Sequence, residues 1–239
     1  MKKIIILILI FRVFFINAQN NGIIEYKYDR ISDNSQDSIK SLIQQQASKF
    51  LLDVYAYAKQ HKYILKFNNN ESLFYKEEGL QSDEVEDPST YRVSLLIFGK
   101  GIYYQNKLKR LQINQKETLH KLFRVRDTIK SDWILTYEKK TILGYKCYKA
   151  KKKCKCGKDI IVWYTPEIPL PFGPAGYNGA PGLILEVISF KDHLKAKKII
   201  LKKNKIEIQE PLEGKFITKK KLEALQWEYR LKAMQRRRK

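Results

Sequence analysis

Apolar and polar residues alternate along much of the chain, a pattern typical of half-buried β-strands. In Gly22–Asp29, isoleucine and tyrosine alternate with Glu25 and Lys27. A hairpin is predicted next, because an alternating run from Tyr63 to Phe67 is followed by three asparagines and a second run, Leu73–Tyr75. Further short strands are predicted at Gly101–Gln105, Leu122–Arg126, Trp133–Glu138, Tyr145–Lys151, Asp159–Tyr164, Gly182–Phe190, Ala196–Leu201 and Ile206–Gln209.

The pattern changes to a helical period in two places. From Ser38 to Gln60 apolar residues recur at intervals of three and four, which predicts one long amphipathic helix. Thr218–Lys239 predicts a basic helix that either docks on the sheet, with a disordered Arg236–Lys239 end, or lies on an anionic surface. Asp83–Thr90 is acidic and is predicted to be a solvated loop. The expected fold is α+β and mostly antiparallel β: a curved meandering sheet with one long helix and a C-terminal basic helix.

The first eighteen residues have the pattern of a secretory signal peptide. Lys2 and Lys3 precede an apolar run that is shorter than a membrane span, and Ala18 offers a small residue at the cut. We therefore expect a signal peptide at 1–18, a β-rich domain at 19–217 and a basic tail at 218–239. The expected location is periplasmic or secreted, with no transmembrane segment after cleavage.

Charge adds a preference for anionic partners. The chain has 47 Lys and Arg against 25 Asp and Glu, a net charge of +22. The expected partner is a lipid, lipopolysaccharide, a peptide or an envelope protein. Export argues against nucleic acid.

The three cysteines allow three interpretations. Cys154 and Cys156 are too close to bridge each other comfortably, so Cys147 is expected to pair with Cys154 or Cys156. Free thiols, or a soft-metal site built from the three sulfurs, are the alternatives. The neighbouring lysines repel a cation, so no metal or cofactor is predicted.

Proline and glycine are concentrated in "PLPFGPAGYNGAPGLILEV", which connects two predicted buried strands. Prolines keep their neighbours extended, and glycines allow close backbone approach. The connection from Thr165 to Gly182 is therefore expected to be stiff, and connections of that length are uncommon unless functional.

This stretch, with "WYTPEIPLPFGP" and the earlier "ILGYKCYKA", resembles the GLPGLI family of secreted Bacteroidota proteins. The naming leucine is replaced by Ala180. The fold is also similar to that expected for lipoprotein carriers, whose sheet is a half-barrel. The family has no settled activity, so the resemblance implies export and a β-rich fold. Its motif falls here on Gly173, Pro174, Gly179, Pro181, Gly182, Leu183 and Ile184.

The predicted function is that of a non-enzymatic envelope binding or accessory protein for an apolar or anionic ligand. No nucleophile elbow, zinc-protease motif or phosphate loop is present in the sequence. The alternatives are an envelope hydrolase that uses Glu167 and Glu186 as an acid/base pair, or a thiol-based metal-binding protein. The aromatic residues expected to contact a ligand are Trp163, Tyr164, Phe172 and Tyr177.

Overall fold

The first half of the chain forms an antiparallel meander. The computed structural model describes residues 20–28, 47–77, 87, 89–91, 93–94, 101–154, 156–189 and 193–236. The 1–18 leader and residues 237–239 of the predicted disordered end lie outside these residues. The meander consists of β1 (Gly22–Tyr28), β2 (Tyr63–Phe67), β3 (Glu71–Lys76), β4 (Ile102–Asn106), β5 (Leu111–Thr118) and β6 (Lys121–Thr128).

A second antiparallel meander follows. It consists of β7 (Ile134–Ile142), β8 (Tyr145–Lys153), β9 (Asp159–Thr165), β10 (Leu183–Ile188) and β11 (His193–Leu201). The short β12 (Lys215–Thr218) then pairs in parallel with β6. The predicted mostly antiparallel fold is confirmed.

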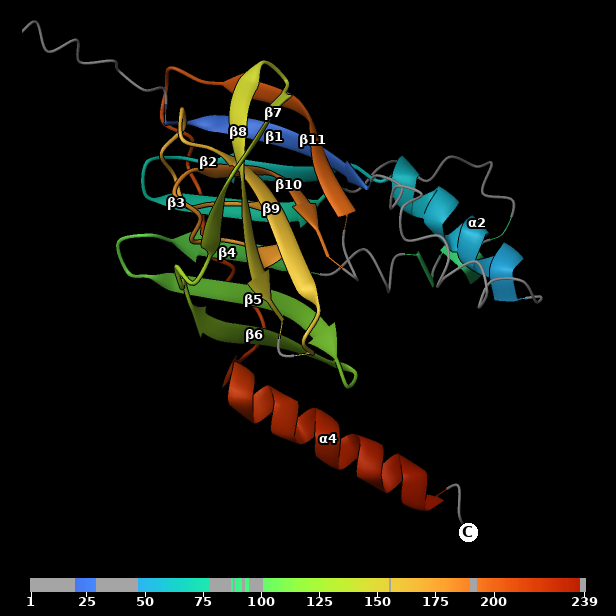
Figure 1. The fold of residues 1–239 in the computed structure, drawn as a ribbon. Coiled ribbons are helices and arrows are strands. Elements are labelled where there is room, and N and C mark those ends of the chain that lie inside the picture. The colour runs from blue at the N-terminus through green and yellow to red at the C-terminus, as the bar shows by residue number, and fades with distance from the viewer. Residues whose placement is uncertain are drawn as a thin grey trace, which may run out of the picture.

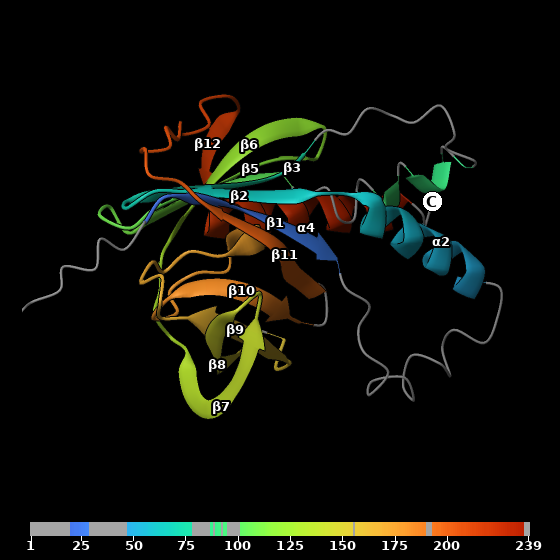
Figure 2. The same cartoon turned by 90° about the horizontal axis from the view of Figure 1, so that it is seen from above.

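Pairing of β1 with β11 joins the two meanders into one open sheet, in the order β12-β6-β5-β4-β3-β2-β1-β11-β10-β9-β8-β7. The sheet does not stay in one plane. Strands β7 to β10 cross over the face of the first meander (Figure 1). Seen from above, they turn away beneath the layer of β1, β2 and β3 (Figure 2). The sheet is thus curved, as the sequence predicts, and its second half bends back over its first half.

The main core lies where the two halves meet. It joins buried residues of β1, β2, β10 and β11 to three residues of the connection between β9 and β10, Ile168, Leu170 and Phe172. These three side chains are at most 3% exposed. The connection, residues 166–182, is called the crossing below.

Two longer helices flank the sheet. α2 (Ala47–Gln60) packs Val54 and Ala58 into the main core, and the predicted part before Ala47 lies outside the described residues. α4 (Lys219–Arg236) docks on β6 and β12 through Leu222, which is 3% exposed. Beyond Leu225, Trp227, Tyr229 and Met234 are exposed, so only the first part of the helix meets the sheet.

Two strands, β5 and β12, were missed, and two predictions about single elements were wrong. β5 was missed because only Leu111 and Ile113 are apolar in a run of polar residues. The strand expected at Ile206–Gln209 is irregular chain, where the Asn68 amide donates to the Ile206 carbonyl (2.9 Å). Of the acidic loop, Ser89 and Thr90 are helical. Residues 83–86 and 88 lie outside the described part of the chain.

Candidate functional site

The crossing is bonded to the sheet along its length. The Leu183 and Ile184 amides donate to the carbonyls of Ile168 (3.0 Å) and Phe172 (2.9 Å). Two backbone hydrogen bonds therefore hold the first half of the crossing against the start of β10, although this half forms no strand of its own. The expectation of a stiff connection between two buried strands fits these contacts.

Close backbone approach explains the glycine at the end of the crossing. Gly179 has φ +82°, and a Cβ there would lie 1.8 Å from the Lys130 carbonyl oxygen. Its amide donates to Pro171 (2.9 Å), its carbonyl accepts from the Ser131 hydroxyl (2.9 Å), and the Trp133 indole donates to the Asn178 carbonyl (2.8 Å). The crossing is thereby fixed to the segment that joins the two meanders.

The four aromatic residues expected to contact a ligand do not line one surface. Phe172 is fully buried in the main core, and Tyr164 is 6% exposed in a second apolar cluster. Tyr177 packs against that second cluster and its hydroxyl donates to Ser189 (3.2 Å). Trp163 is half-buried and packs against the main core. We therefore centre the candidate site on Trp163.

A row of side chains crosses four strands at Trp163. Lys149 on β8 pairs with Trp163 on β9, Trp163 with Glu186 on β10, and Glu186 with Lys195 on β11. Cross-strand partners point to the same side of a sheet. We call these four residues, with Lys140 above them, the Trp163 face. The Lys140 ammonium lies 4.2 Å from the centre of the indole ring, within the range of a cation–π contact.

Glu186 is the buried charge of this face. Its side chain is 4% exposed, it forms an ion pair with Lys140, and one carboxylate oxygen lies 3.0 Å from His193 Nε2. Burial alone would raise the pKa of Glu186. Hydrogen bonds from His193 and Lys140 and the charges of Lys140 and Lys195 outweigh it, so the pKa lies below its ordinary value.

This arrangement limits the chemistry of Glu186. An ionised carboxylate has no proton to supply, and each oxygen of Glu186 already accepts from one donor. Glu167 is exposed and accepts from the Lys146 amide (2.8 Å). Glu186 is thus the ion-pair partner of Lys140, and the geometry does not favour a carboxylate-pair hydrolase.

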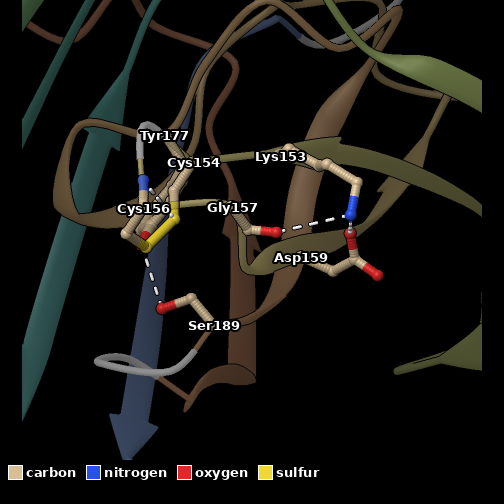
Figure 3. The surroundings of a disulfide bond; sticks show 7 residues. All are labelled: Lys153, Cys154, Cys156, Gly157, Asp159, Tyr177 and Ser189. Carbon is tan, nitrogen blue, oxygen red and sulfur yellow. Dashed lines mark hydrogen bonds and ion pairs between the residues drawn. A yellow bond between two sulfur atoms is a disulfide. The ribbon is translucent and has the colours of Figure 1, made fainter.

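The predicted disulfide of Cys147 is wrong. Cys154 bridges Cys156, with 5.1 Å between the Cα atoms, in the turn that Figure 3 shows. Cys147 is a free, fully buried thiol near the other end of β8. Seven residues of strand separate it from Cys154 by about 23 Å at about 3.3 Å per residue, too far for a bond. Among the described residues, no group of three His, Cys, Asp or Glu could hold a metal ion.

Sequence reasoning missed Lys140, Lys149 and His193. Alternation along β8 does put Lys149 on the same side as Cys147, but pairing with Trp163 depends on strand register, which one sequence does not reveal. Within the described part of the chain, no helix is long and apolar enough to cross a membrane.

The fold and the site define an open antiparallel β domain. Its Trp163 face carries lysines beside an indole, and the buried, ionised Glu186 is paired with Lys140 and His193. Residues 103–228, more than half of the chain, match the family described as N-glycanase peptide, N-terminal domain, and the chain belongs to that family.

Two solved structures of PNGF-II share the fold. One, in a C2 crystal form, has a TM-score of 0.52 at 15% identity and aligns with 87% of this chain and 32% of its own. The other, in a P21 form, has a TM-score of 0.51 at 16% identity, with 87% and 33% aligned. The chain thus spans about a third of the length of these proteins. No curated protein matches it.

Proposed function

We propose that the chain is an exported, non-enzymatic binding domain that holds an acidic saccharide on the Trp163 face. The observation that carries the proposal is the half-exposed indole of Trp163 bordered by Lys140, Lys149 and Lys195. Export and membership of the GLPGLI group are part of the proposal and rest on the sequence.

The chemistry of the face favours an anion with an apolar side. Lys149 and Lys140 keep 20% and 32% of their side chains exposed, so both side chains can be reached from solvent. Glu186 and Glu138 bind these lysines, which orients the ammonium groups beside the ring. A carboxylate or phosphate would bind between the lysines, and the indole would contact the sugar ring.

The family description supports carbohydrate as the ligand class, because it names an N-glycanase. A non-catalytic domain that holds a glycan would serve as an accessory to such an enzyme. The high net charge of the chain supports an acidic glycan over a neutral one.

Isothermal titration of the purified chain with an acidic lipopolysaccharide core oligosaccharide tests the proposal, with a neutral oligosaccharide and anionic lipid vesicles as parallel arms. Lys149→Gln should weaken binding by about five- to tenfold, because a hydrogen bond to a charged group contributes about 1–1.5 kcal/mol here. Lys152→Gln is the matched control, since Lys152 lies on the same strand three residues on and so points to the other face.

Absence of saturable binding to the acidic oligosaccharide would refute the proposal. Equal weakening by Lys152→Gln would refute the placement on the Trp163 face, and binding to vesicles alone would make the ligand a lipid headgroup.

A further inference from the structure

The turn between β8 and β9 carries a disulfide that the fold does not require. The Cys154 amide donates to the Lys158 carbonyl (2.9 Å) and the Gly157 amide to the Cys154 carbonyl (3.0 Å), so backbone bonds already close the turn. Disulfides stabilise more when they close longer loops, and this one joins residues two apart. Its contribution to stability is therefore among the smallest a disulfide can make.

The same bond is accessible to an incoming thiol. Cys156 is exposed and Cys154 is half-buried. Figure 3 shows the bond at the turn, with Lys153 and Asp159 to one side and Tyr177 and Ser189 among its surroundings. Because Cys156 is the more exposed residue of the two, its sulfur is the expected point of nucleophilic attack.

The turn also stabilises the thiolate that such an attack would release. The Cys156 amide donates to the Cys154 sulfur (3.2 Å), a contact that strengthens when the sulfur carries negative charge. Lys153 donates to the Gly157 carbonyl (3.3 Å) and pairs with Asp159 (3.5 Å), so its charge is partly offset, and Lys158 adds a further positive charge to the turn. Amide donors and nearby lysines lower a thiol pKa and make the sulfur a better leaving group.

We propose that Cys154 and Cys156 form a thiol–disulfide exchange site that oxidises a dithiol peptide. A peptide thiolate attacks the Cys156 sulfur, the Cys154–Cys156 bond breaks, and its electron pair goes to Cys154. The second peptide thiolate then attacks the mixed disulfide and releases Cys156. One peptide disulfide is formed, both cysteines are reduced, and the two protons of the peptide thiols pass to water or to the new thiols. This activity is separate from binding at the Trp163 face.

The test uses the full chain in its oxidised form. It is equilibrated in buffers of increasing reduced-to-oxidised glutathione ratio, alkylated without denaturant, and analysed by peptide mass spectrometry. Cys147 is fully buried and serves as an internal reporter, since it is labelled only when the fold opens. The expected result is labelling of Cys154 and Cys156, half complete in a mixed glutathione buffer, while Cys147 stays unlabelled.

A structural disulfide would behave differently: Cys154 and Cys156 would stay oxidised until Cys147 is also labelled, and that result would overturn the proposal. A rate measurement gives a second criterion. Lys158→Gln should slow oxidation of a two-cysteine peptide about threefold, the response expected for a change of about one unit in thiol pKa. Lys146→Gln, at the far end of β8, should leave the rate unchanged; equal rates in all three proteins would refute the role of the lysines and with it the built site.

Discussion

Replacing Gly179 with alanine tests whether the crossing is a rigid part of the fold. Gly179 has φ +82°, and its new Cβ would lie 1.8 Å from the Lys130 carbonyl oxygen, a distance that backbone atoms cannot accept. Gly144, in the turn between β7 and β8, has φ +84° with no atom within 4 Å of a Cβ. The two alanine variants therefore share the same dihedral strain and differ only in the collision.

The magnitude follows from these contacts. A left-handed conformation costs an alanine about 1–2 kcal/mol, and this applies to both variants. To relieve the collision in Gly179→Ala, the crossing must move away from residues 130–133. Two hydrogen bonds to that segment would be lost, from Ser131 to Gly179 and from Trp133 to Asn178. At about 1 kcal/mol each, they bring the total to about 3–4 kcal/mol.

Thermal unfolding followed by circular dichroism measures the difference. With about 2–4 °C per kcal/mol for a chain of this size, Gly179→Ala should unfold about 4–8 °C below Gly144→Ala. Hydrogen exchange should also be faster at the Ile184 amide, because this amide donates to the Phe172 carbonyl of the crossing. If the two variants unfold at the same temperature, the crossing is not fixed to the sheet as described, and the reasoning fails.

Three further predictions concern other parts of the molecule. Burial and the Lys76 charge lower the pKa of His61 from 6.5 to about 4, so the unfolded chain takes up the proton first. The free energy of unfolding should therefore fall as pH drops from about 6.5 towards 4, and urea titrations of His61→Gln between pH 6.5 and 5 should show a flatter dependence. Leu222→Ala should increase hydrogen exchange throughout α4, whereas Leu231→Ala, at a residue 41% exposed, should not; equal effects would contradict the docking of α4 by its first part. Replacing Cys154 and Cys156 together with serine should cost only about 1.6 kcal/mol, the chain entropy of a three-residue loop, and a much larger loss in urea unfolding would assign the bond a structural role.

Local patterns predicted most of the strands, because the alternation of apolar and polar residues in a strand reflects which of its side chains are buried. The alternation in Gly22–Asp29 and the hairpin around Asn68–Asn70 follow from burial of one face, which any sheet arrangement would impose. β5 shows little of this alternation, because many of its side chains make polar contacts. One example is Gln112, whose side-chain oxygen accepts from the Gln105 amide (3.3 Å). β12 was missed because it is four residues long and pairs with a strand about ninety residues earlier.

The site was less predictable because it depends on pairing between strands. Trp163 was recognised as an aromatic next to the crossing, but Phe172 and Tyr164 are core residues that the same composition could not distinguish from ligand contacts. The disulfide prediction failed for a related reason. It assumed that Cys147 lies near the turn, whereas Cys147 is at the start of a nine-residue strand and points into the core.

An irregularity in β10 links the crossing to the Trp163 face. Ile184 pairs with Tyr164, but the next pair is Glu186 with Trp163, so Leu185 is an extra residue in the ladder. In a regular ladder Leu185 would pair with Trp163, and Glu186 would pair with Val162 inside the second apolar cluster, without Lys140 or His193. An unpaired carboxylate buried there would be strongly destabilising. The residue before the bulge is Ile184, whose amide donates to Phe172 and whose carbonyl accepts from the Tyr26 hydroxyl. By fixing Ile184, the crossing determines where the bulge falls, and the bulge brings Glu186 beside the indole and its lysines.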